Sequence, residues 1–239
     1  MSLTITVLGV GGCGCNCINR ILESKVFDEF KNIEFCIADT DSQALSCSLA
    51  NTKICLGKKT TIETDCNAGF LSFMTKTLFG NKTTGESGCK GDVNIGEKSA
   101  RESKKDITEL LKNTDILLVI AGLGSGTGTG ATPVIIETAK ELGIIPIAVI
   151  IKPFSFEGKK RKEIAESGSD KIKKIVKFGV EVSNDKLLEV AGEETTLEDA
   201  YRLVDEKTIP FIKYVIDLSS RMSNKNDFSE GCKDLLKLP

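Results

Sequence analysis

Short apolar runs alternate with amphipathic segments along most of this chain. Six runs have the composition of strands: 3–8, 33–38, 53–56, 115–121, 144–151 and 176–182. The runs 115–121 and 144–151 are almost entirely apolar, as in strands buried on both faces. Apolar residues at helical spacing between and after them predict five helices: 16–24, 97–112, 132–142, 159–174 and 197–218, the last with Pro210 as a kink. This alternation predicts an α/β fold with a doubly wound, mostly parallel, right-handed sheet and helices on both faces.

Two glycine-rich segments follow predicted strands. The first, GVGGCG at 9–14, matches the G-x-G-x-x-G dinucleotide pattern, although a tight strand–helix turn also produces this match. The second, GLGSGTGTG at 122–130, has five glycines in nine residues, more than a structural turn needs, and lacks the lysine of a Walker loop. Its amides can converge on an anion, with Thr127 and Thr129 adding hydroxyl donors. Both loops should lie at the carboxyl edge of the sheet, where such folds bind ligands.

Composition narrows the classes of partner. The chain has 239 residues, 28% of them charged, and a formal net charge of −2, so no global field recruits nucleic acid or acidic lipid. No apolar run reaches the roughly 20 residues that span a bilayer. The start of the chain lacks the features of a signal peptide. We therefore expect a cytoplasmic protein with no nucleic-acid partner and no direct membrane contact.

Cysteine is unusually frequent and histidine is absent. Nine scattered cysteines cannot form a complete set of disulfides, and free thiols fit a reducing compartment. Cys13, Cys15 and Cys17 raise the possibility of zinc, but a closed zinc site needs about four ligands. Packing of small residues in a tight turn is the preferred interpretation, and no metal site is predicted within the protein.

The motifs resemble the FtsZ/tubulin family over almost the whole chain, and FtsZ more than eukaryotic tubulin. Five segments carry the resemblance in the family's order: GVGGCGCN, ADTDSQAL, GLGSGTGTG, KPFSFEGKKR and SNDKLLEV. The chain departs from the pattern at Ser125, where a glycine is usual, at Asp39, where FtsZ has asparagine, and at two first-loop glycines replaced by cysteine. GCKGDVNIG at 88–96 is a poor match to the loop that senses the γ-phosphate.

The resemblance implies a site for GTP or GDP, with Mg²⁺ held mainly through the phosphates. On the two loops it implies contacts, chiefly through backbone N–H groups, from Gly11, Gly12, Cys13, Gly14, Asn16, Gly124, Ser125, Gly126, Thr127, Gly128 and Thr129. Glu157 would accept from ribose hydroxyls and Arg161 would reach ribose or phosphate, unless they form an ordinary ion pair at a helix start.

The guanine side is implied by three further residues. Asn184 and Asp205 would face the base, and an aspartate accepts from the N1–H and amino groups that adenine lacks. Tyr201 would stack on the base, although its spacing suits a helix-core residue equally well.

In this family, catalysis is divided between subunits. The resemblance places Asp227 and Glu230 on the acidic loop that enters the next subunit's nucleotide site and positions water. Acidic residues also open helices for purely structural reasons. The implied partner is a second copy of the chain, in a head-to-tail oligomer or filament.

Domain organisation follows the same comparison. We expect a GTP-binding domain at 1–218, then the catalytic-loop region and the start of a following helix at 219–239, with the family's second domain absent. An insertion at 62–84 should contain an added helix at 68–80.

Three functional hypotheses remain. The leading one is a self-assembling, FtsZ-like cytoskeletal GTPase. The second is a GTP-binding regulator or membrane-associated scaffold that does not hydrolyse GTP. The third, a NAD-dependent oxidoreductase, rests on the first loop and Asp39, but no histidine is present for acid–base catalysis.

Overall fold

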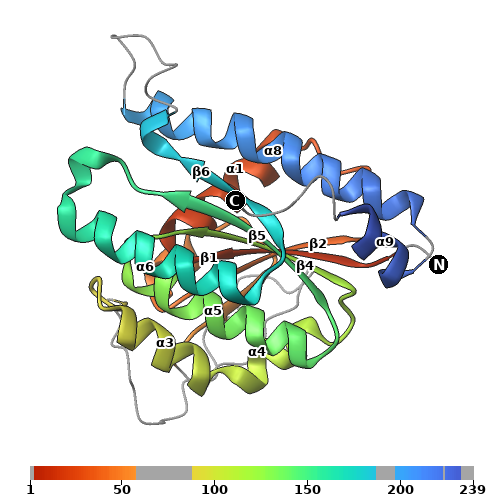
Figure 1. Ribbon diagram of the computed structural model, residues 1–239, viewed down its shortest axis with the longest axis horizontal. Helices are drawn as coiled ribbons and strands as arrows, with labels where there is room; N and C mark the ends of the chain where they lie inside the picture. The colour runs from red at the N-terminus through yellow and green to blue at the C-terminus, as the bar shows by residue number, and fades with distance from the viewer. Residues whose placement is uncertain (1–2, 58–87, 187–196, 223, 233–239) are drawn as a thin grey trace.

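The computed structural model describes residues 3–57, 88–186, 197–222 and 224–232. Its centre is a six-stranded sheet of order β3-β2-β1-β4-β5-β6 in which every neighbouring pair is parallel (Figure 1). The strands are β1 Ile5–Val10, β2 Ile33–Asp39, β3 Thr52–Cys55, β4 Ile116–Gly122, β5 Ile145–Lys152 and β6 Phe178–Ser183. The α/β class and the parallel sheet are confirmed, with strand ends shifted by up to two residues.

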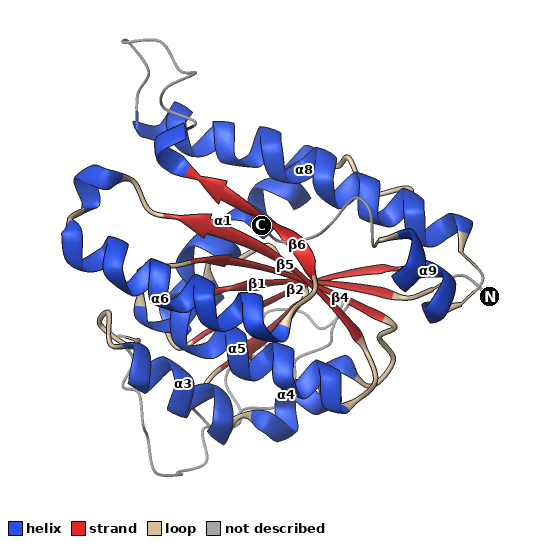
Figure 2. Cartoon of the chain, viewed as in Figure 1, coloured by secondary structure: helices blue, strands red, loops and turns tan. Residues whose placement is uncertain are grey.

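The sheet separates two apolar layers. Along β4, Ile116, Leu118 and Ile120 join the layer beneath α1 (Gly11–Ser24) and α8 (Leu197–Arg221). The alternate residues Leu117 and Val119 join the opposite layer. Figure 2 shows helices on both sides of the sheet. All of β4 is buried, as expected for a central parallel strand covered on both faces. This packing fixes the carboxyl ends of β1 and β4 side by side.

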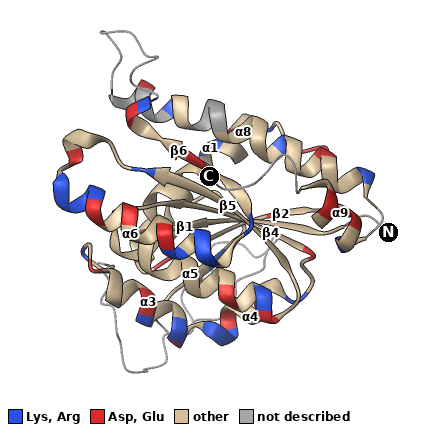
Figure 3. Cartoon of the chain, viewed as in Figure 1, with Lys and Arg blue, Asp and Glu red and all other residues tan. Residues whose placement is uncertain are grey.

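Helices on the second face form the other layer. They are α3 Val93–Glu102, α4 Lys104–Leu111, α5 Gly126–Glu141 and α6 Lys159–Ile175. Residues of both signs alternate along the outward sides of α3, α4 and α6 (Figure 3). No helix in the described part of the chain is long and apolar enough to cross a membrane.

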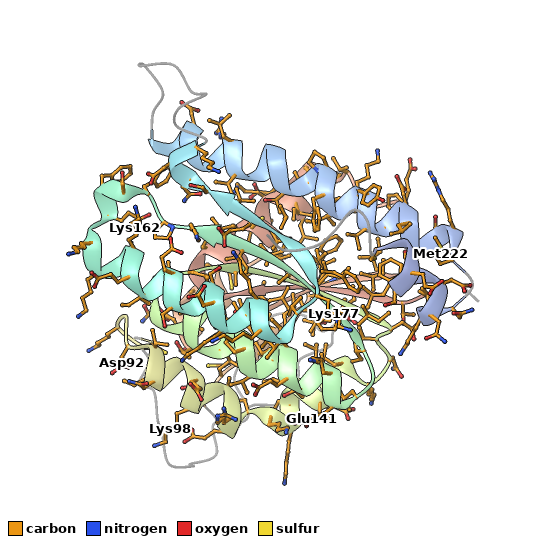
Figure 4. All side chains as sticks on the ribbon, viewed as in Figure 1. Asp92, Lys98, Glu141, Lys162, Lys177 and Met222 are labelled. Carbon is orange, nitrogen blue, oxygen red and sulfur yellow. The ribbon has the colours of Figure 1, made fainter. Side chains whose placement is uncertain are left out.

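The single helix predicted at 97–112 is wrong. The segment forms two helices that meet at Ser103, whose hydroxyl accepts a hydrogen bond from the Gly57 amide at 2.9 Å. The start of α3 also lies earlier than predicted, because Asp92 caps it by accepting from the amides of Asn94 and Ile95 (Figure 4). The polar segment after β2 likewise contains a short helix, α2 (Ser42–Ser46).

The glycine-rich segments differ most from the prediction. Helix α1 begins at Gly11 and α5 at Gly126, so much of each expected loop is the first turn of a helix. A Cβ at Gly14 would lie 2.3 Å from the Ile120 carbonyl oxygen, and one at Gly128 would lie 2.1 Å from the Gly122 carbonyl oxygen. Close helix–strand packing therefore accounts for several of these glycines, in addition to any role in binding.

The remaining helices complete the layer over α1. The end of α8 passes through Met222, labelled in Figure 4, to the short helix α9 (Lys225–Gly231). Phe228 of α9 is fully buried and joins the apolar layer shared with α1 and α8. The predicted helix at 68–80 and insertion at 62–84 lie outside the described residues.

Candidate functional site

A cavity of about 310 Å³ lies at the carboxyl edge of the sheet, where β1, β4 and β5 lead into their following segments. This volume is in the range of small-molecule sites. Seven of the predicted nucleotide-binding residues line it together: Gly12, Cys13, Asn16, Ser125, Glu157, Arg161 and Asn184. The fold thus brings four segments that are far apart in sequence to one cavity.

The helices that follow β1 and β4, which are α1 and α5, have no side-chain cap. The residues preceding the first turns of α1 and α5 are Val10 and Ser125, and neither makes a capping hydrogen bond through its side chain. Three other helices, α2, α3 and α9, are capped by Asp41, Asp92 and Asn224, whereas α4 and α6 also lack a side-chain cap. The first amides of a helix have no partner within it and carry partial positive charge. Two such N-termini beside one cavity suit an anionic group such as phosphate.

Asn184 supplies an unusual acceptor. It follows β6, is 3% exposed and lines the cavity, and its Oδ1 has no hydrogen-bond partner among the described residues. A buried polar atom without a partner costs about 1–3 kcal/mol. A ligand that donates a hydrogen bond to Oδ1 would remove this cost.

Glu157 and Arg161 form an ion pair in the wall of the same cavity. Glu157 ends the short 3₁₀ helix η2 (Ser155–Glu157), and its Oε2 accepts from the Arg161 guanidinium one turn into α6. Its Oε1 accepts from the Phe154 amide at 2.9 Å. The carboxylate is largely buried while Arg161 is half exposed. The pair is thus preorganised at the cavity and retains lone pairs that can accept from a hydroxyl.

The hydroxyls of the second loop bond within the protein. Thr127 Oγ1 lies 2.7 Å from Thr40 Oγ1, and Thr129 Oγ1 accepts from the Gly124 amide at 2.9 Å. Both threonines are buried. These bonds hold the start of α5 in place, and they leave backbone amides as the loop's main donors toward the cavity.

Asp39 does not take the position that the dinucleotide hypothesis requires. It is 5% exposed, and its Oδ1 accepts from the amides of Thr40 at 2.6 Å and Asp41 at 3.3 Å. Burial raises the pKa of the Asp39 carboxyl, against these hydrogen bonds. It is not among the residues that line the cavity. A ribose contact from Asp39 therefore has no support in this geometry.

Sequence reasoning missed part of the cavity wall. Arg20 lines it one turn after Asn16 on α1, and this i, i+4 spacing was the available signal. Pro153, between β5 and η2, also lines it. The backbones of Tyr201 and Asp205 belong to α8, but their side chains lie outside the described residues.

Asp227 and Glu230 lie at the other end of the sheet. Both are exposed on α9, and Lys225 of the same helix bonds to Asp115 and to the Gly143 carbonyl oxygen, just before β4 and β5 begin. The strand arrows in Figure 2 point away from α9. These carboxylates therefore lie at the amino edge of the sheet, and the length of the strands separates them from the cavity.

The fold and site together define an α/β domain whose parallel sheet has two glycine-rich helix starts beside one cavity. The family model for the Tubulin/FtsZ family, GTPase domain, matches residues 4–192. The chain belongs to this family.

Individual relatives agree with this assignment. The chain is 36% identical over 227 residues to the cell division protein FtsZ of Coxiella burnetii, covering 95% of this chain and 52% of that protein. It therefore spans about half the length of this curated relative.

Solved structures are similar as well. The empty FtsZ dimer of M. jannaschii superposes with a TM-score of 0.75 at 30% identity, covering 93% of this chain and 57% of that one. The GTPγS-bound protofilament of CetZ2 from Haloferax volcanii has a TM-score of 0.71 at 14% identity, covering 92% of this chain and 60% of that one, and shows the fold alone.

Proposed function

We propose that this chain binds GTP and GDP in the cavity at the carboxyl edge. The observation that carries the proposal is the buried Oδ1 of Asn184, which has no hydrogen-bond partner in the described part of the chain and lies in the same cavity as the uncapped starts of α1 and α5. The first feature fits a donor on a base, and the second fits phosphates. A single ligand that satisfies both features carries a hydrogen-bond donor and an anionic group, as a nucleotide does.

Each part of the nucleotide has a candidate partner. Asn184 accepts from the N1–H or the amino group of guanine, with Asp205 as the second acceptor proposed by resemblance. Glu157 accepts from ribose hydroxyls while Arg161 holds its carboxylate in place. Backbone amides of 11–14 and 125–129 bind the phosphates, and no lysine acts as the principal phosphate ligand. Mg²⁺ is held mainly through the phosphates.

We further propose that hydrolysis requires a second copy of the chain. Asp227 and Glu230 lie at the opposite edge from their own cavity, so they reach a nucleotide only on a neighbouring subunit. A head-to-tail contact puts the amino edge of one copy against the carboxyl edge of the next, and repetition of this heterologous contact gives a filament. A carboxylate there orients the attacking water. The proposed setting is an FtsZ-like cytoskeletal filament in the cytoplasm.

A regulator or scaffold that binds GTP without hydrolysing it is the second candidate. It is favoured by the local bonding of Asp227, whose Oδ2 accepts from the Asn224 side-chain amide at 2.9 Å at the start of α9. A carboxylate in that position stabilises the helix start whether or not it acts in catalysis.

Two measurements test these proposals. Calorimetric titration should show GTP and GDP binding much more tightly than ATP, and equal affinity for ATP would contradict the proposed site. GTP turnover per subunit, measured over a range of protein concentrations, should rise where sedimentation shows assembly. Turnover that stays at background while assembly proceeds would favour the second candidate.

A further inference from the structure

Two cysteines differ from the rest in accessibility. Among the eight cysteines in the described part of the chain, Cys13 is partly exposed and Cys47 is exposed, whereas the other six are buried. Burial raises the pKa of the Cys15 thiol far above its ordinary value and does the same for Cys36. Such thiols remain protonated and out of reach of solutes. Of the Cys13, Cys15, Cys17 run, only Cys13 can react.

Cys13 lies inside the candidate nucleotide cavity. It occupies the first turn of α1, which contains no acidic residue, and its side chain lines the cavity together with Arg20 and Arg161. Unpaired amides at a helix start favour a thiolate over a thiol. The unpartnered Asn184 Oδ1 in the same cavity independently indicates that a ligand binds there.

Gly122 closes one side of Cys13. A Cβ added at Gly122 would lie 2.4 Å from Cys13 Cβ and 2.8 Å from its sulfur. The thiol is thus packed against the end of β4, between the two glycine-rich segments. A group attached to the sulfur has no room on that side, whereas the cavity that Cys13 lines offers space.

We propose that Cys13 is a covalent-modification site at which a low-molecular-weight disulfide forms a mixed disulfide that excludes nucleotide. This proposal rests on the proposed function, because it assigns thiol-based control to the same cavity. The Cys13 thiolate, its proton released to solvent, attacks one sulfur of the small disulfide. The S–S bond breaks, and the departing thiolate takes up a proton. A small thiol reverses the exchange.

The experiment uses the complete 239-residue chain after removal of reductant. Cystamine serves as the small disulfide, with and without saturating GDP, and peptide mass spectrometry locates each adduct. The affinity of the treated protein for a fluorescent GDP analogue is then measured before and after dithiothreitol. Cys47→Ser is the matched control because it removes the exposed thiol outside the cavity. Cys13→Ser is compared only with its own untreated form.

The expected result has three parts. Cystamine adds to Cys13, GDP slows this addition at least 10-fold, and the adduct weakens nucleotide affinity at least 10-fold until dithiothreitol restores it. Cys47→Ser keeps this response, whereas Cys13→Ser loses it. If Cys13→Ser does not fold, the effect of GDP on the rate of cystamine addition to Cys13 in the native chain still tests the proposal.

Two other results are distinguishable. The proposed modification site is wrong if the reduced chain binds nucleotide but cystamine does not modify Cys13. It is also wrong if the chain modified at Cys13 binds nucleotide as tightly as the reduced chain. If the reduced chain binds no nucleotide at all, the proposed function is wrong, and the exclusion of nucleotide by the adduct is overturned with it.

Discussion

Lys225 Nζ lies 3.2 Å from Asp115 Oδ1 and joins α9 to the amino edge of the sheet. The same amine donates to the Gly143 carbonyl oxygen at 3.2 Å, so one side chain connects α9 to the segments before β4 and β5. Asp115 also accepts from the amide and hydroxyl of Thr4, both at 2.9 Å. The helix that carries Asp227 and Glu230 is thereby held in a fixed position.

Replacing Lys225 tests this connection. Lys225→Ala should increase hydrogen exchange across 224–232 and lower assembly-dependent GTP turnover, while GTP affinity stays unchanged because the cavity lies at the other edge. Both partners are about one-third exposed, so the stability cost should be below about 1 kcal/mol. The control is Lys98→Ala, which removes an exposed pair on α3. Unchanged exchange in α9 would show that the pair does not hold the helix.

Glu230→Ala tests the proposed division of catalysis. In this variant, turnover per subunit should no longer rise with protein concentration, a loss of about 100-fold or more at concentrations where the native chain assembles. Nucleotide affinity should be retained, because Glu230 is remote from its own cavity. Mixing Glu230→Ala with a variant that binds no nucleotide provides a further check. Each copy then lacks a different half of the shared site, and partial recovery of turnover is expected.

Asn184→Leu replaces the side chain that carries the unpartnered acceptor with an apolar side chain of similar volume. Affinity for GTP should fall by about 1–2 kcal/mol, the usual contribution of one hydrogen bond to a buried acceptor. The free energy of unfolding without nucleotide should stay the same or rise, because a buried unsatisfied atom is removed. Calorimetry and urea denaturation measure the two effects. An unchanged GTP affinity would exclude Asn184 as a base contact.

The glycines of the two loops should separate into packing and binding positions. Gly128→Ala places a Cβ 2.1 Å from the Gly122 carbonyl oxygen and should destabilise the fold by about 1–3 kcal/mol or more. Gly12→Ala meets nothing within 4 Å, so stability should hold or rise by up to about 1 kcal/mol. Its new methyl enters the cavity, and nucleotide affinity should fall. Equal stability of both variants would contradict the packing argument.

A charged network between β5, β6 and α6 should make stability depend on pH. Glu181 bonds to Lys152 at 2.8 Å, to Lys173 at 3.2 Å and to the Ser169 hydroxyl at 2.7 Å. Burial raises the pKa of the Glu181 carboxyl, but these three partners outweigh it and the pKa is lowered overall.

This network predicts a specific pH profile. A lowered folded-state pKa gives stability that is present above the ordinary glutamate pKa of 4.5 and lost as pH falls through the lower folded value. Glu181→Gln should therefore cost about 1–3 kcal/mol at pH 7, and the difference from the native chain should shrink below pH 4.5. Urea denaturation between pH 7 and pH 3 measures it. Glu109→Gln, which alters an exposed pair on α4, should show almost no such difference.

Much of the fold could be predicted from the sequence because its signals are local. The buried composition of β4 and the alternation of strands with helices specified a parallel sheet. Parallel strands share a carboxyl edge, so both glycine-rich segments had to lie there. The resemblance of the motifs added seven residues that do line one cavity.

Tertiary packing decided the rest. Glycines look like loop residues in sequence, but Gly14 and Gly128 lie near the starts of helices. The carbonyl oxygens of Ile120 and Gly122 approach their backbones so closely that a side chain would not fit. The break at Ser103 depends on a hydrogen bond to Gly57, which is distant in sequence. The unpartnered state of Asn184 Oδ1 and the separation of α9 from the cavity are properties of spatial arrangement. The sequence does not predict either feature, because each depends on contacts between residues that are far apart in the chain.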